Sequence, residues 1–196
     1  MEKKLPDALE QIVASFATAR PLRVMFQDEA RFGRISRNRY CWAPRPLRPM
    51  VKASLTHEYT YAYGAVSPMD GRFDSLVLPH VNTECMQLFI NEIGNRCPQE
   101  NIIMVVDGAG WHRANALTMP DNIRLHFLPP YSPERNPQEH LWDELREKYF
   151  HNQVFESIDS LEDQLVTGLT HLEQHPDLVR SIAGWEWIIT SVSNAN

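Results

Sequence analysis

Residues 101–107 read Asn-Ile-Ile-Met-Val-Val-Asp, an uninterrupted apolar run that ends on a carboxylate. A strand without alternating polar positions is buried on both faces, which is typical of the interior of a parallel sheet. Sheets of this kind place their functional groups at the carboxyl ends of the strands. The run therefore predicts a buried strand over residues 101–106, with Asp107 at the edge where a site would lie.

A second compact apolar run, Leu22–Gln27, leads into Asp28 and predicts another buried strand. An acid at such a position is more often a polar terminator that faces water than a functional group. For Asp107 this bland interpretation is weaker, because Gly-Ala-Gly at residues 108–110 would let a ligand approach the backbone. The two acids define a candidate site that the rest of the sequence has to support.

The remaining pattern alternates strands and helices. Tyr59–Val66 and Arg72–Leu78 flank a Ser-Pro-Met-Asp-Gly turn and predict a hairpin. Apolar periodicity and capping residues predict helices over residues 8–17, 82–96, 111–117, 137–150 and 160–174, and a strand over residues 123–128. This order predicts an α/β fold with a mixed sheet flanked by helices. We expect a helical lead-in over residues 1–20 and one domain over residues 21–196.

Composition excludes several classes of protein. The 43% apolar and 22% charged residues are ordinary for a folded soluble chain, and no apolar run approaches the ~18 residues that cross a bilayer. The cysteines, Cys41, Cys85 and Cys97, are scattered and form no Cys-x-x-Cys pair, which argues against a disulfide framework and a cysteine zinc site. We therefore expect a cytoplasmic protein without membrane association.

Glu139 is the candidate for a third acid, and it has two interpretations. Residues 136–139, Asn-Pro-Gln-Glu, fit a helix start in which Glu139 completes a capping box with Asn136. At about 100° per residue, Glu139 also flanks the predicted buried stripe and can lean over the sheet edge; the stripe consists of Leu141, Trp142, Leu145 and Tyr149. Asp143 lies nearly opposite this stripe, so it is only the fallback.

Asp28, Asp107 and Glu139 would form a donor set for hard divalent cations. Oxygen ligands with octahedral preference select Mg²⁺ or Mn²⁺ over zinc. Two such ions about 4 Å apart activate the attacking oxygen and stabilise the leaving oxyanion in phosphodiester chemistry. Without a cation the carboxylates would repel one another and raise their pKa values. His112, close to Asp107 in sequence, could contact the scissile phosphate or move a proton; a surface histidine without a function is an equal interpretation.

Residues 31–52 are strongly basic and contain no Asp or Glu, although the chain has a net charge of −6. Arginine is suited to bidentate phosphate contacts, and Tyr40 and Trp42 could stack on bases. A solvated loop whose charges serve only solubility is the alternative. A carboxylate-pair glycosidase, a more distant reading of the acids, would not need these charges. The predicted phosphate contacts are Arg31, Arg34, Arg37, Arg39, Arg45, Arg48 and Lys52.

Three blocks of sequence contain the acids. They are Phe-Gln-Asp-Glu-Ala-Arg-Phe-Gly (26–33), Val-Val-Asp-Gly-Ala-Gly-Trp-His (105–112) and Leu-Pro-Pro-Tyr-Ser-Pro-Glu-Arg-Asn-Pro-Gln-Glu-His-Leu-Trp (128–142). In this order they resemble the DDE transposases, specifically bacterial insertion-sequence enzymes related to the mariner group. The resemblance implies a ribonuclease H-like fold, with the acids on the first strand, after the fourth strand and on a later helix. Carried onto this chain, the catalytic and metal-binding acids are Asp28, Asp107 and Glu139.

The resemblance also implies an activity and partners. Enzymes of this group use divalent metal to cleave DNA at transposon ends, and the freed 3′-hydroxyl then attacks target DNA. The expected partners are DNA, a second copy of the chain and a separate helix-turn-helix chain, and the expected location is the prokaryotic nucleoid. Arg135 stands where the group more usually has an apolar residue, so we expect it to contact DNA. A structure-specific ribonuclease H-like endonuclease, or a catalytically inactive truncated product that binds DNA and regulates, are the alternatives.

Overall fold

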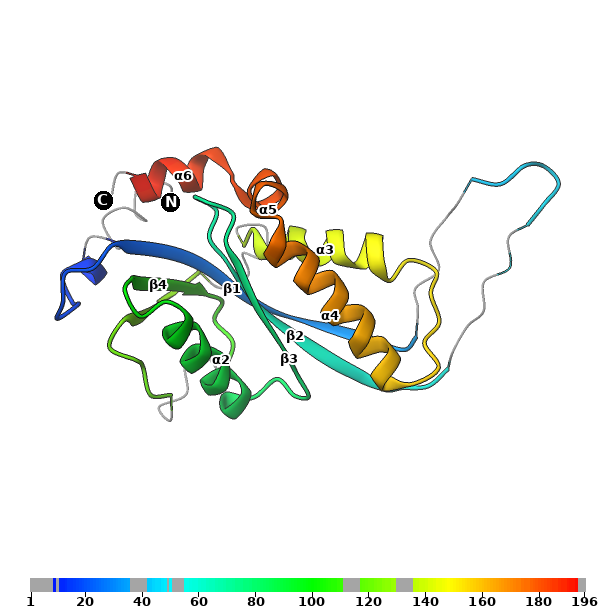
Figure 1. Cartoon of the computed structure of the whole chain (residues 1–196), viewed down its shortest axis with the longest axis horizontal. Coiled ribbons are helices and arrows are strands. Elements are labelled where there is room, and N and C mark those ends of the chain that lie inside the picture. Colours follow the sequence, from blue (N-terminus) through cyan, green and yellow to red (C-terminus); the bar gives the residue numbers. More distant parts are fainter. Residues whose placement is uncertain are drawn as a thin grey trace.

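A five-stranded sheet carries helices on both faces (Figure 1). The computed structural model describes residues 9, 11–35, 42–48, 50, 55–110, 117–129 and 136–193. The strands are β1 (Leu22–Gly33), β2 (Tyr59–Val66), β3 (Phe73–Leu78), β4 (Asn101–Val106) and β5 (Ile123–Phe127). The helices are α2 (Thr83–Arg96), α3 (Gln138–Tyr149), α4 (Ile158–Gln174), α5 (Pro176–Ala183) and α6 (Glu186–Ser193). The α/β class expected from the sequence is confirmed.

The strand order is β3-β2-β1-β4-β5, with β1 at the centre. β1 pairs antiparallel with β2, and β2 with β3, because the turn between β2 and β3 reverses the chain within a few residues. β1 pairs parallel with β4 after the crossover that α2 supplies between β3 and β4, and β4 pairs parallel with β5 after the connection over residues 107–122. The carboxyl ends of β4 and β5 therefore lie at the same edge of the sheet, on the side toward which β1 runs.

The two faces of the sheet carry separate apolar cores. Along β4, Ile103 and Val105 pack in the core under α3, α4, α5 and α6, whereas Ile102, Met104 and Val106 pack against α2. Figure 1 shows α2 on one side of the sheet and α3 and α4 on the other. Burial on both faces explains why residues 102–106 are apolar without alternation.

β1 is longer than the sequence predicts. The expected strand ends at Gln27, but β1 continues to Gly33, because Phe26 to Gly33 pair with Val66 to Tyr59 in the antiparallel half of the sheet. Asp28 consequently lies within a strand and not after it. The prediction was wrong because strand length here is set by a partner strand distant in sequence.

The chain ends also differ from expectation. Residues 11–13 are helical and residues 14 and 15 form a turn, so the lead-in helix stops short of residue 17. The sequence predicts helices toward the C-terminus without bounds beyond residue 174, and the structure places α5, which begins with Pro176 in its first turn, and α6 there. The helix expected over residues 111–117 falls almost entirely outside the described residues. Within the described ranges, no helix has both the length and the apolarity to cross a membrane.

A substitution at Gly71 tests the geometry of the turn between β2 and β3. Its φ of 75° lies in the left-handed region, and a Cβ there would lie 1.9 Å from the carbonyl oxygen of Pro176. Gly71→Ala should lower the free energy of unfolding by about 2 kcal/mol or more, measured by urea denaturation. Gly33→Ala is the matched control, since its Cβ would meet only ordinary contacts of 3.5 Å and longer. Equal stability of both variants would contradict the turn geometry.

Candidate active site

Asp28 lies on the face of β1 that α3 covers. Its carboxylate oxygen Oδ2 accepts a hydrogen bond of 3.2 Å from the indole Nε1 of Trp142. Its partner in β2 is Gly64, and a Cβ on Gly64 would lie 2.6 Å from Gln138 Nε2 and 2.7 Å from the Trp142 ring. The missing side chain at Gly64 is therefore what lets α3 approach the strand that carries Asp28.

Asp107 follows β4 directly, on the strand next to Asp28. The parallel register pairs Phe26 with Val105, so two further residues along each strand bring Asp28 level with Asp107. Neighbouring strands lie about 4.8 Å apart. The Asp107 carboxylate accepts a hydrogen bond of 2.9 Å from the backbone N–H of Ala109, which holds the bend after the strand. The predicted position of the second acid, after the fourth strand, is confirmed.

Glu139 lies in the first turn of α3 and is partly buried. The side chain of Asn136 accepts from the backbone N–H of Gln138, but Pro137 and not Asn136 occupies the N-cap position of α3, and none of the side chains that the structure describes caps the helix. No hydrogen bond from the described residues engages the Glu139 carboxylate, so the reciprocal half of the capping box is not formed. Asp143 has a side chain that is 74% exposed and pairs with Arg146, as the helix geometry predicts.

The pKa of Asp28 depends on both of the other candidate acids. Burial, followed by repulsion from Glu139, Glu29 and Asp107, raises the pKa of Asp28 from 3.8 to about 8. The backbone N–H of Glu29 opposes this shift. Both other candidate acids thus act on Asp28, from β4 and from α3. An acid that is neutral at pH 7 for this reason is a group that a nearby cation would ionise.

The donor set fits a hard divalent cation in its chemistry. Asp28, Asp107 and Glu139 provide oxygen ligands only, and a cation would relieve the repulsion at Asp28. Within the described part of the chain, however, no three carboxylate, imidazole or thiolate groups are close enough to surround one ion. A coordination shell would therefore require the side chains to draw together around the ion.

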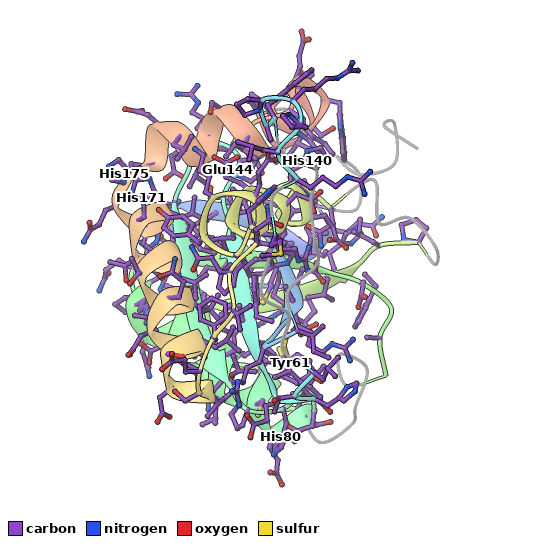
Figure 2. The ribbon with its side chains drawn as sticks, turned by 90° about the vertical axis from the view of Figure 1, so that its right-hand side faces the viewer. Tyr61, His80, His140, Glu144, His171 and His175 are labelled. Carbon is purple, nitrogen blue, oxygen red and sulfur yellow. The ribbon has the colours of Figure 1, made fainter. Side chains whose placement is uncertain are left out.

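The basic segment is only partly described. Arg45 and Arg48 are exposed. The guanidinium carbon of Arg31 lies 5.3 Å from the centroid of the Tyr59 ring, and that ring packs edge-on against the ring of Tyr61, which is labelled in Figure 2. Arg34 is mostly buried and bonds to Glu58 and to the backbone carbonyls of Phe155 and Glu156, so a phosphate contact by Arg34 would have to replace these bonds. Arg37, Arg39, Tyr40, Lys52, His112 and Arg135 lie outside the described residues.

Three buried polar groups near the acids were not identified from the sequence. Gln27 and Gln138 are fully buried, and the sequence reading assigned Trp142 only to the apolar stripe. Its indole N–H was the available signal, because a buried tryptophan usually finds an acceptor. His140, next to Glu139, packs edge-on against Trp185 at 5.0 Å between ring centroids and is exposed on α3 (Figure 2).

Known proteins resemble this chain in sequence. The profile of a family described as DDE superfamily endonuclease matches residues 23–162. A protein of Sinorhizobium fredii (strain NBRC 101917 / NGR234), named "Uncharacterized protein y4pE/y4sA", is 38% identical over 130 residues, which cover 66% of this chain and 96% of that protein.

Solved structures of the Mos1 transposase share the fold. A pre-cleavage Mos1 transpososome matches with a TM-score of 0.60 at 16% identity, over 100% of this chain and 62% of that chain. The mariner Mos1 paired end complex with Mg matches with a TM-score of 0.58 at 14% identity, over 100% and 61%. This likeness confirms the expected ribonuclease H-like fold. The chain spans less than two thirds of the length of these transposases.

The shifted pKa of Asp28 predicts a pH-dependent stability. Because folding raises the pKa of Asp28, its contribution to the free energy of unfolding falls as the pH rises from 3.8 to about 8. The fall is up to about 1.4 kcal/mol per pH unit. Asp28→Asn should therefore raise the melting temperature of metal-free protein more at pH 8 than at pH 5. Asp143→Asn, at an exposed position, should have the melting temperature of the wild type at both pH values. The same shift for Asp28→Asn at both pH values would contradict the assignment.

Proposed function

Because the chain belongs to the DDE superfamily endonucleases, we propose that it is the catalytic part of a transposase. In this proposal it cuts DNA at transposon ends and joins the freed 3′ ends to target DNA. The observation that supports the proposal is that Asp107 and Glu139 both raise the pKa of Asp28, with Asp107 following the strand next to the one that carries Asp28.

Mg²⁺ or Mn²⁺, with two ions per site, is the proposed cofactor. Asp28, Asp107 and Glu139 would hold the ions, which when bound supply the positive charge that activates the attacking oxygen and stabilises the leaving one. The chain itself presents two carboxylates from adjacent strands and one from the start of a helix, while Trp142 fixes one oxygen of Asp28. Among the relatives, Mos1 paired end complexes are described with Mg and with Mn.

DNA is the proposed substrate. The exposed Arg45 and Arg48, together with Arg31, support this because they give an acidic protein a basic segment that leads away from β1. The structures of Mos1 include a paired-end complex with a transposon end, a property of that protein that motivates the same substrate class here. A second copy of the chain, a separate helix-turn-helix chain and a location at the nucleoid stay predictions from the resemblance.

Removal of single acids tests the reaction. Asp107→Asn or Glu139→Gln should lower Mn²⁺-dependent cleavage of a DNA duplex by a factor on the order of 10³ or more, because each would remove a charged ligand of the ions. Gel analysis of labelled DNA measures both cleavage and strand transfer. Asp143→Asn is the matched control on α3 and should cleave at the wild-type rate.

The same assay separates the other functions. Full activity of Glu139→Gln, with a loss of only about 1 kcal/mol in stability, would limit Glu139 to stabilising the start of α3. Cleavage without strand transfer would favour a structure-specific endonuclease. A wild-type chain that binds DNA without cutting it would favour a regulatory product.

Arg45 and Arg48 predict a salt-dependent affinity. If both contact phosphates, the double variant Arg45→Gln and Arg48→Gln should reduce the slope of log K against log salt by up to about 2. Fluorescence anisotropy of a labelled duplex between low and moderate salt measures the slope. Arg180→Gln, which removes an exposed charge on α5, should leave it unchanged. An unaltered slope in the double variant would show that these arginines do not contact DNA.

A further inference from the structure

We propose that Asn136 and Trp142 are positioning residues that fix Asp28 and Glu139 relative to one another before metal binds. This inference rests on the proposed function and concerns how the site is assembled. Neither side chain is a ligand in the proposal. Each acts through one of the acids or through the backbone next to it.

Asn136 joins the two segments that carry the acids. Its side-chain Nδ2 donates a 3.0 Å hydrogen bond to the carbonyl oxygen of Gln27, the residue before Asp28. Its Oδ1 accepts a 3.1 Å hydrogen bond from the backbone N–H of Gln138, the residue before Glu139. The Asn136 carbonyl also accepts from the N–H of Glu139 at 3.2 Å. One side chain, only 4% exposed, therefore spans from the strand to the helix.

The hydrogen bond from Asn136 to Gln27 continues the pairing of β1 with β4 by one step. The carbonyl of Pro21 accepts from the N–H of Asn101, and carbonyls two residues apart along a strand face the same side. The carbonyl of Gln27 thus belongs to the series that faces β4, one step beyond the last paired residues, Phe26 and Val105. Asn136 thus bonds to β1 at the point where β1 and β4 stop pairing, at the residue before Asp28.

Trp142 orients the carboxylate of Asp28. Its Nε1 donates to Asp28 Oδ2, and its ring is fully buried between Phe32 and Phe73, with centroid separations of 6.3 Å and 6.2 Å and nearly perpendicular planes. A ring confined in this way points its N–H in one direction. The Asp28 carboxylate is consequently oriented from α3, the helix that also carries Glu139.

Packing alone would not require this polar arrangement. Within the described residues, Gln27 Oε1 and both amide atoms of Gln138 are buried without a hydrogen-bond partner. An unpaired buried polar group lowers stability, and such groups concentrate at functional sites. The polar cluster at the junction of β1 and α3 therefore marks a place where the arrangement of the acids takes precedence over stability.

The test is a direct measurement of Mn²⁺ binding. Asn136→Ala and Trp142→Phe should each weaken Mn²⁺ binding by about 10-fold or more, the usual effect of removing a group that orients a ligand. The Kd is measured by electron paramagnetic resonance of free Mn²⁺, and the thermal shift that Mn²⁺ causes is measured beside it. Cleavage at low Mn²⁺ should fall by a similar factor and recover in part at high Mn²⁺.

Asn101→Ala is the matched control. Asn101 is also a buried asparagine whose Nδ2 donates to a backbone carbonyl, that of Thr18 at 2.8 Å, but it lies at the opposite end of β4. It should lower the melting temperature by about as much as Asn136→Ala and leave the Kd for Mn²⁺ unchanged. Trp142→Phe keeps a buried aromatic ring but loses the N–H together with the part of the indole that carries it, so it provides an independent test if Asn136→Ala fails to fold.

The outcomes distinguish the two proposals. Wild-type Kd values in Trp142→Phe and in folded Asn136→Ala, or an equal weakening in Asn101→Ala, overturn the positioning role while the wild type still binds and cleaves. A wild-type chain whose Mn²⁺ binding is insensitive to Asp28→Asn and Asp107→Asn overturns the proposed function itself, and the positioning role with it.

Discussion

The packing of α3 across β1 and β2 is the contact on which the candidate site depends. Gly64 leaves the space that Gln138 and Trp142 fill, and the buried Trp142 ring reaches Asp28 through that space. A side chain at Gly64 would displace the helix from the strand. Glu139 would then move away from Asp28 with the first turn of α3, and its effect on the pKa of Asp28 would weaken.

Folding brings together acids that repel one another, and the two apolar cores stabilise the sheet against this repulsion. Burial and the charges of neighbouring acids make ionised Asp28 unfavourable, which its raised pKa records. The strands that carry the aspartates are held by apolar contacts on both faces of the sheet, from Phe26 and Val105 on one side to Met25 and Met104 on the other. Because such interiors are close-packed, the strands act as a rigid support for groups that repel one another.

Local sequence patterns were sufficient to predict the class of fold and the order of its main elements. The unalternated run at residues 102–106 required burial on both faces, and the turn before Arg72 required a hairpin, since both signals are local. The helix period also separated Glu139 from Asp143, because the direction of a side chain on a helix follows from spacing alone. The three blocks of sequence indicated the family that the profile match shows.

The length of β1 and the surroundings of the acids depend on contacts between segments that are distant in sequence. β1 continues past Asp28 because β2, distant in sequence, pairs with it, and no local pattern records that partner. The bonds from Asn136 to Gln27 and from Trp142 to Asp28 join residues more than a hundred positions apart. Capping and core packing were sufficient local explanations for both side chains. Their second role arises only when the sheet and α3 meet, because a hydrogen bond depends on distance and direction in space and not on sequence spacing.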